Sequence, residues 1–134
     1  MSPNAPPPTP VSLPASACAG PALDHERLEV YRLALDFHAL ACTLVPSRGF
    51  RTLRDQLERA SLGIALCIAE GAGRTSGPDK RRFYEMARGS ATESAALLDV
   101  LRVRRLLDAA GHGHSRDLAL RLVQMLSRLC APPR

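Results

Sequence analysis

Apolar side chains recur every three or four residues along four stretches of the chain, and short runs rich in Gly, Pro and Ser separate those stretches. This period puts the apolar residues on one side of an α-helix. No stretch shows the sustained apolar–polar alternation of a half-buried β-strand. We therefore expect helices at residues 23–44 and 51–70, a third that follows a cap at Ser76 and continues to 108, and a fourth that follows a cap at Ser115 and ends before Pro132. Four amphipathic helices with short connections predict an all-α, antiparallel up-down four-helix bundle.

The start of the third helix is the clearest boundary. Ser76 stands at the N-cap, Pro78 follows in the first turn, and Asp79 lies three residues after the cap. Each is a residue type favoured at its position. At the end of the second helix we expect Gly71 and Gly73 to supply the backbone freedom that a helix C-terminus commonly uses.

Two glycines are expected to separate the third and fourth helices. Gly111 and Gly113 interrupt the apolar pattern, and Ser115 is the expected cap of the fourth helix. His112 and His114 then fall in the loop between them. Because no cysteine or clustered carboxylate lies nearby to complete a metal site, we expect no bound metal.

Small residues lie in the middle of both the second and the third helix. Pairing outward from a turn centred near Arg74 places Gly89 and Ser90 opposite residues 60–63. A glycine inside a helix costs about 1 kcal/mol relative to alanine. Gly63 and Gly89 therefore predict a compensating close approach of two helix backbones.

The third helix carries more apolar surface than a single core needs. After Ser94, apolar residues cover more than half of the circumference of the predicted helix, whereas an isolated bundle helix should show one stripe. These residues are Leu97, Leu98, Val100, Leu101, Val103, Leu106 and Leu107. The excess predicts self-association of the chain.

The first 22 residues differ in composition from the rest of the chain. They hold seven of the 11 prolines and no charged side chain, so we expect a disordered tail at 1–22 and a bundle at 23–131. A docking role for the tail with a proline-binding partner stays open. We find no secretory signal and no apolar run long enough to span a bilayer, and we expect a cytoplasmic protein without membrane contact.

The chain lacks the residue patterns of common catalytic and cofactor sites. Cys18, Cys42, Cys67 and Cys130 are scattered without a C-x-x-C pair, and the last three are expected to be small core residues on helices. Neither a G-x-S-x-G nor a phosphate-binding glycine loop occurs, and no Glu-x-x-His pair is present. We expect no enzyme activity, no cofactor and no small-molecule substrate.

Net charge adds a candidate partner. The chain has 18 Lys and Arg residues against 13 Asp and Glu, for a net charge of +5, and Lys80 is the only lysine. The candidate nucleic-acid-binding residues lie on the second helix, the following turn and the third helix: Arg51, Arg54, Arg59, Arg74, Lys80, Arg81, Arg82 and Arg88. Two interpretations stay open, a surface that holds phosphates and an ordinary solvated face balanced by nearby carboxylates. Most of the aromatic residues are expected to be buried, which leaves few surfaces for base stacking.

Four segments together resemble a known family. They are LEVYRLALDF at 28–37, the Q-L-x-R-A pattern at 56–60, I-A-E-G-x-G-R at 68–74, and Phe83 followed by A-x-G-S-x-x-E at 87–93. Over residues 23–130 the chain resembles the four-helix-bundle proteins found in intervening sequences of bacterial 23S rRNA genes. Where that family usually has S-I-P-A-N-I-A-E-G, this chain has Ala65 in place of the proline and Cys67 in place of the asparagine.

The resemblance implies a homo-oligomer, with a pentameric ring as the known style, an association with RNA loci, and kinship to accessory proteins of diversity-generating retroelements. It also marks nine positions, for which we expect structural roles: Gln56, Glu70, Gly71, Gly73, Arg74, Phe83, Gly89, Ser90 and Glu93. Among them, Glu93 is expected to be a buried or half-buried carboxylate that accepts a hydrogen bond from Gln56. For Glu70, Arg74 and Glu93, contact with a partner is the alternative to a role in helix register.

The function that fits these observations is a non-enzymatic, homo-oligomeric scaffold that binds RNA, DNA or a ribonucleoprotein through its arginine-rich surfaces. The alternative is an oligomeric protein–protein interaction module without a nucleic-acid role.

Overall fold

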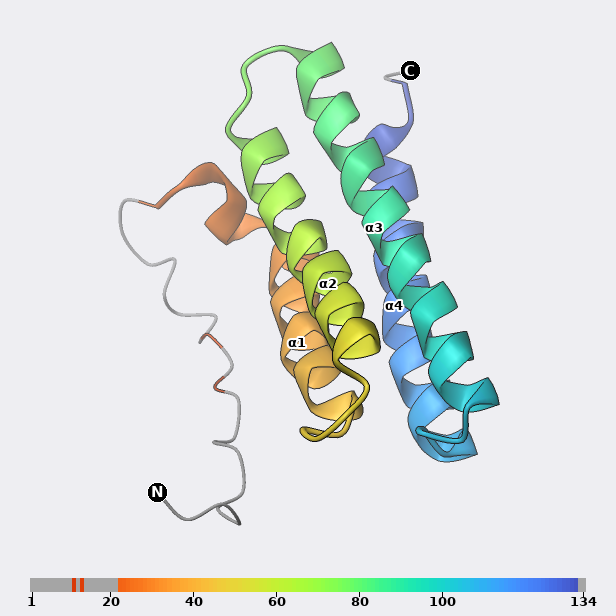
Figure 1. Ribbon diagram of the computed structural model, residues 1–134. Coiled ribbons are helices and arrows are strands. Elements are labelled where there is room, and N and C mark those ends of the chain that lie inside the picture. Colours follow the sequence, from red (N-terminus) through yellow and green to blue (C-terminus); the bar gives the residue numbers. More distant parts are fainter. Residues whose placement is uncertain (1–10, 12, 14–21, 133–134) are drawn as a thin grey trace.

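Helices form most of the described chain, which comprises residues 11, 13 and 22–132 of the computed structural model. In this part of the chain the structure has no β-strand, and its helices are η2 (Asp24–Arg27, a 3₁₀ turn), α1 (Glu29–Leu44), α2 (Arg51–Ala72), α3 (Gly77–Val103) and α4 (Ala109–Cys130). Each α-helix runs antiparallel to and packs against the next, and α1 also contacts α4 (Figure 1). The predicted four-helix bundle is confirmed.

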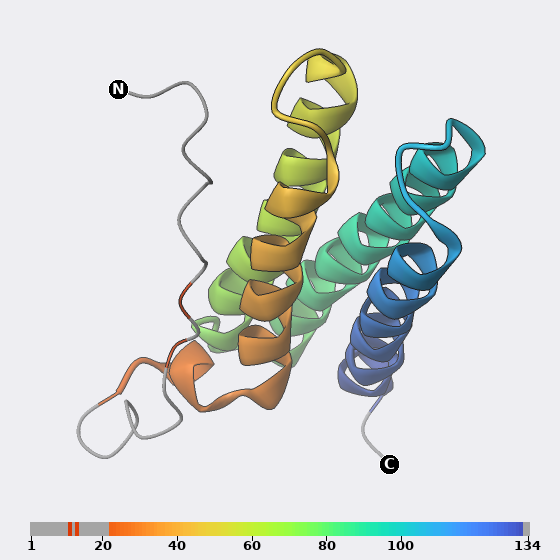
Figure 2. The ribbon, with the colours of Figure 1, turned by 90° about the horizontal axis from the view of Figure 1, so that it is seen from below.

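The bundle is made of two helical hairpins. The hairpin of α1 and α2 is inclined to the hairpin of α3 and α4 (Figure 2). The two hairpins pack against each other mainly through α2 and α3. None of the described helices combines the length and the apolar character that a membrane span requires. Most of the predicted tail lies outside the described residues.

The predicted start of α3 is confirmed, but the first helix begins later than expected. The Ser76 hydroxyl oxygen accepts a hydrogen bond from the backbone N–H of Asp79 at 3.2 Å. At the other boundary the chain makes the short η2 turn and then an extended residue, Leu28, before α1 starts at Glu29. The predicted continuous helix from Leu23 was therefore wrong by about one turn and a half.

The boundary between α3 and α4 was predicted wrongly. α3 ends at Val103, and Arg105 adopts a left-handed conformation with φ of 59°. The N–H groups of Arg105 and Leu106 then bond to the carbonyls of Arg102 and Leu101, which is a Schellman motif with arginine at the position usually held by glycine. Helix α4 starts at Ala109, so the connection is formed by residues 104–108 and not by the glycines at 111 and 113.

Asp108, and not Ser115, caps α4. Its carboxylate accepts a hydrogen bond from the Gly111 N–H at 2.7 Å. Gly111 and Gly113 therefore lie inside the helix, together with His112 and His114. The acidic cap Asp108, which follows the apolar pair Leu106 and Leu107, outweighs the weak helix propensity of the two glycines.

The core lies between the facing sides of the four helices and includes three buried hydroxyls. Its largest fully buried apolar side chains are Phe37, Leu57, Ile64, Ile68, Leu98, Leu101, Leu122 and Leu126. Ser61, Ser94 and Ser115 are also fully buried. Each hydroxyl donates to a backbone carbonyl three or four residues earlier in its own helix, at 3.2, 2.9 and 2.6 Å. These bonds remove the desolvation penalty of the hydroxyls.

The close approach of α2 and α3 is present, but Gly89 takes no part in it. A Cβ on Gly63 would lie 3.3 Å from Ser90 Oγ, so this predicted contact is confirmed. Gly89 is exposed and a Cβ there would meet nothing within 4 Å. The closest approach is at Gly71, where a Cβ would lie 2.9 Å from the Tyr84 ring and 3.0 Å from Phe83 Cβ. Gly89 precedes Ser90 in the chain and is rotated from it by about 100° around the helix, which carries Gly89 out of the interface.

The apolar excess on α3 is smaller in the structure than the sequence suggested. Leu97, Leu98 and Leu101 are buried in the core of the same chain. Val100 and Val103 remain 39% and 81% exposed. Part of the surface that predicted self-association is therefore used inside the bundle.

Candidate nucleic-acid interface

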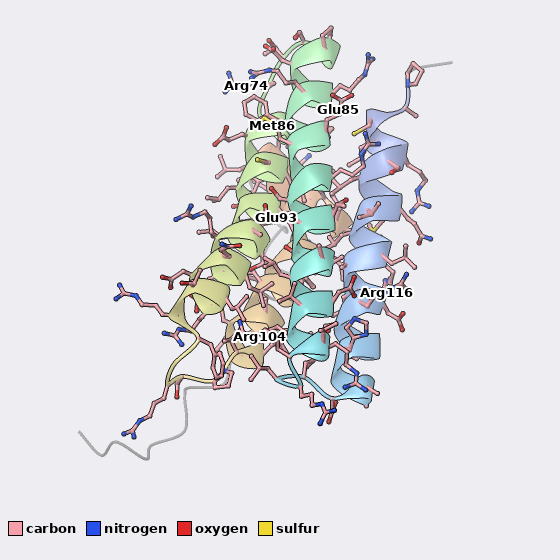
Figure 3. All side chains as sticks on the ribbon, turned by 45° about the vertical axis from the view of Figure 1, so that its right-hand side comes forward. Arg74, Glu85, Met86, Glu93, Arg104 and Arg116 are labelled. Carbon is pink, nitrogen blue, oxygen red and sulfur yellow. The ribbon has the colours of Figure 1, made fainter. Side chains whose placement is uncertain are left out.

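The predicted basic residues divide between the two ends of the bundle. Arg51 begins α2 and Arg74 follows its end, so the 22 residues of the helix place them about 30 Å apart. Figure 3 shows the same separation, with Arg74 at one end of α3 and Arg104 at the other. Arg59 and Arg88 lie between the two ends. The structure therefore does not bring the eight residues into one patch.

At the α2–α3 end, two guanidinium groups lie over one phenyl ring. The Cζ atoms of Arg74 and Arg82 are each 4.6 Å from the centroid of Phe83. Phe83 is only 6% exposed and packs against Gly71, which fixes the ring. Neither arginine forms an ion pair within the described residues. Both guanidinium groups therefore contact the ring and not a carboxylate.

The other two cations at this end differ from each other. Lys80 donates from Nζ to the carbonyl oxygen of Ala72 at 2.8 Å, which satisfies a free carbonyl at the end of α2. Arg81 and Lys80 line a shallow hollow of about 200 Å³ together with Tyr84. Burial, and secondarily the carboxylate of Asp24, raises the pKa of Tyr84 above 10.0, so its hydroxyl stays protonated and can donate a hydrogen bond.

At the α1–α2 end, one predicted arginine is used within the fold and another is paired. Arg54 Nη1 donates to the carbonyl oxygens of Pro46 and Gly49, both at 2.9 Å. Arg51 forms an exposed ion pair with Asp55 at 3.6 Å, and such pairs contribute little to stability.

The same end carries an aromatic residue that the sequence analysis missed. Phe50 is 41% exposed, although most aromatic residues were expected to be buried. The Cζ atom of Arg104 lies 5.5 Å from the ring centroid. One feature of the sequence indicates an exposed position, since Phe50 stands in a connection between Gly49 and an arginine-rich helix start.

The residues that match the family motifs are placed in two different ways. Gly71, Phe83 and Ser90 lie in the α2–α3 contact. Gly71 lies inside α2, and Gly73 ends the helix with φ of −81°, so neither uses a positive φ that requires the backbone freedom of glycine.

The polar members of this group face solvent. Glu70, Gln56 and Glu93 are all exposed, so the prediction of a buried Glu93 was wrong. Figure 3 shows Glu93 on the outer side of α3, on the same side as Met86.

A cysteine–histidine pair between α1 and α2 does not form a reactive site. His38 Nδ1 lies 2.8 Å from the buried Ser61 hydroxyl, and Cys42 Sγ lies 3.7 Å from His38 Nε2. Burial raises the pKa of the Cys42 thiol, and the nearby Glu58 carboxylate raises it further, so little nucleophilic thiolate forms. Cys42 is exposed, which corrects its expected place in the core; Cys67 is half-buried and Cys130 is buried.

Among the described residues, no three His, Cys, Asp or Glu side chains lie close enough together to hold a metal ion. His112 is instead paired with Asp99, with Nε2 2.8 Å from the carboxylate oxygen. This pair links α3 to the start of α4.

The chain matches known proteins at the level of a family model. No curated protein matches the chain. The family model described as 23S rRNA-intervening sequence protein matches residues 26–128, which span α1 to α4 almost completely. The chain therefore belongs to the 23S rRNA-intervening sequence protein family.

Proposed function

We propose that this protein is a non-enzymatic, self-associating bundle of the cytoplasm that binds RNA or DNA through its arginine-rich ends. The observation that carries the proposal is the arrangement of Arg74 and Arg82 over Phe83. Two like charges beside one ring repel each other, and neither guanidinium has a carboxylate oxygen within 4.0 Å among the described residues. A bound phosphate would reduce this repulsion.

The geometry of these groups suits phosphate recognition. Guanidinium groups present a rigid fork of N–H donors to phosphate oxygens, and stacking on a ring reduces the side-chain entropy lost on binding. The stacked groups lie at the exposed end of the α2–α3 hairpin, where Arg74 follows α2 and Arg82 lies in the second turn of α3. Contacts of this kind read the backbone and carry little sequence preference.

Self-association is the second part of the proposal and is supported by exposed apolar residues on α2 and α3. Leu62, Leu66 and Met86 are 43, 53 and 48% exposed, and Val103 is 81% exposed. Burial of such side chains against a second copy would be favourable by about 25 cal/mol per Å². A ring of five chains is the size that the family resemblance implies, and each added chain would repeat the basic ends.

The test is a salt titration of binding to a labelled RNA and to a labelled DNA. We expect binding at about 50 mM salt and a steep loss of affinity as salt rises, because binding releases counterions from the phosphates. Arg74→Ala combined with Arg82→Ala should lower the salt slope by about 1.4 on a single strand, which is two phosphate contacts. Arg116→Ala with Arg121→Ala removes the same charge from exposed positions on α4 and is the matched control.

Equal losses in the two double variants would show that net charge alone, and not the Phe83 arrangement, drives binding. Absence of binding to either nucleic acid at low salt would contradict the proposal. The second candidate, an oligomeric protein–protein module, would then be favoured by the exposed apolar residues and by an apolar groove of about 250 Å³ between α1 and α4, lined by Leu28, Val30 and Met125 among others.

A further inference from the structure

Phe50 is held in an unusual backbone conformation at the exposed end of the bundle. It occupies the N-cap of α2 with φ of 52° and ψ of 31°, directly after Gly49 with φ of 72°. The left-handed region is unfavourable for residues other than glycine, and N-caps are usually Ser, Thr, Asp or Asn in an extended conformation. A phenylalanine therefore gains nothing from this position as a helix cap.

Burial does not compensate for this conformation either. Phe50 is 41% exposed and is absent from the core. Sparsely populated conformations of this kind persist where the surrounding structure holds them, and they concentrate at binding sites. Here the holding group is Arg54, whose two hydrogen bonds to the carbonyls of Pro46 and Gly49 fix the loop that presents Phe50.

A second segment supplies a cation to the ring. Arg104 is the C-cap residue of α3, and its guanidinium carbon lies 5.5 Å from the centroid of the Phe50 ring. Its neighbour Arg105 has the left-handed φ of 59° that ends the helix, so the two connections of this end meet at the Arg104–Phe50 contact. Arg48 and Arg51 are exposed in and directly after the Phe50 loop. An exposed ring thus stands among several cations.

The nearby carboxylates neutralise only part of this cluster. Asp55 pairs with Arg51 in an exposed contact at 3.6 Å that a phosphate could replace. Asp108 is used to cap α4 through the Gly111 N–H. Within the described residues, Arg48 and Arg104 form no ion pair.

We propose that Phe50 and Arg104 form a stacking site for an unpaired base of single-stranded nucleic acid, with the adjoining phosphates on Arg48 and Arg51. This inference rests on the proposed nucleic-acid function and adds the class of ligand, since a base inside a duplex cannot reach the ring. Aromatic rings and guanidinium planes both stack on bases, and phosphates are held by the surrounding arginines. Phe50 has no hydrogen-bonding group, so the site accepts any base.

The test compares labelled single-stranded and double-stranded oligonucleotides of the same sequence by fluorescence anisotropy, using the full chain. Phe50→Leu keeps an apolar side chain of similar volume at the same position and removes the ring. We expect it to weaken single-strand binding by about 5- to 160-fold, the range for loss of one stacked base, and to leave duplex binding unchanged. Phe50→Trp should keep the affinity, and its emission should be quenched by the single strand.

Arg104→Lys is the companion variant, because it retains the charge and loses the planar group. We expect weaker single-strand binding, whereas a purely electrostatic role for Arg104 would leave affinity unchanged. Melting curves of each variant check that the bundle is intact.

Wild-type affinity of Phe50→Leu for the single strand would overturn the inference while leaving the proposed function in place. Failure of the wild-type chain to bind any oligonucleotide would overturn both. Quenching of Phe50→Trp by a peptide of residues 1–22, without a response to the oligonucleotide, would assign the ring to a peptide partner and also overturn the inference.

Discussion

Single residues in this bundle have roles that depend on which way they face, as two glycines on neighbouring helices show. Gly71 faces Phe83 and Tyr84 across the α2–α3 contact, whereas Gly89 faces open space. Both were predicted to be structural from their place in the chain. The sequence places small residues near the contact, but the rotation of a helix by a few tens of degrees decides which of them enters it.

We expect Gly71→Ala to destabilise the protein by about 1–3 kcal/mol, the range for forcing extra atoms into a packed contact. The new Cβ would lie 2.9 Å from the Tyr84 ring and would also displace Phe83, which positions Arg74 and Arg82. Urea denaturation measures the loss. Unchanged stability would mean that the contact between α2 and α3 is looser than described.

Gly89→Ala is the opposite case and should stabilise the chain by about 0.5–1 kcal/mol, since the site is exposed, helical and open. The same denaturation experiment compares it with Gly71→Ala. A loss of stability instead would show that another chain packs directly over Gly89.

His38 predicts a pH dependence of stability. Burial lowers its pKa below the ordinary value of 6.5, and the nearby Glu58 only partly opposes this. The unfolded chain therefore binds more protons than the folded chain as pH falls, so the stabilising contribution is present above pH 6.5 and is lost progressively below it. The free energy of unfolding of wild type and of His38→Gln should converge between pH 7.5 and 5.5. Parallel curves would contradict the assignment.

At the scale of elements, the start of α3 was easier to predict than the connection between α3 and α4. Ser76 and Asp79 form a local pattern that the structure reproduces. Arg105 does not reveal its left-handed conformation by residue type, because glycine is the usual occupant of that position. The prediction followed Gly111 and Gly113 and missed Asp108, whose cap formed despite the glycines that follow it.

Arg105→Gly should therefore stabilise the bundle by about 1 kcal/mol, since the left-handed conformation is unfavourable for arginine and free for glycine. Thermal melting measures the gain, and Arg102→Gly, inside α3, serves as the contrasting variant that should lose stability. A lower melting temperature for Arg105→Gly would mean that the arginine side chain contributes contacts that outweigh the strain.

At the scale of the whole molecule, the fold follows from the pattern of apolar residues, but the candidate interface does not. The pattern places cations on helix faces without showing which are used internally. Arg54 and Lys80 bind backbone carbonyls, while Arg74 and Arg82 stack on Phe83. Such roles depend on the turns at the helix ends, and these turns are not encoded in the periodicity of any one helix.

The central claim is that several copies of this bundle assemble and hold nucleic acid by charge. Size-exclusion chromatography with multi-angle light scattering, run with a single-stranded RNA at about 50 mM salt, tests both parts at once. We expect a complex that contains several chains and RNA, and release of the RNA at high salt with the protein assembly retained. A protein mass of 14.5 kDa, the mass of one chain, with the RNA eluting separately, would contradict it.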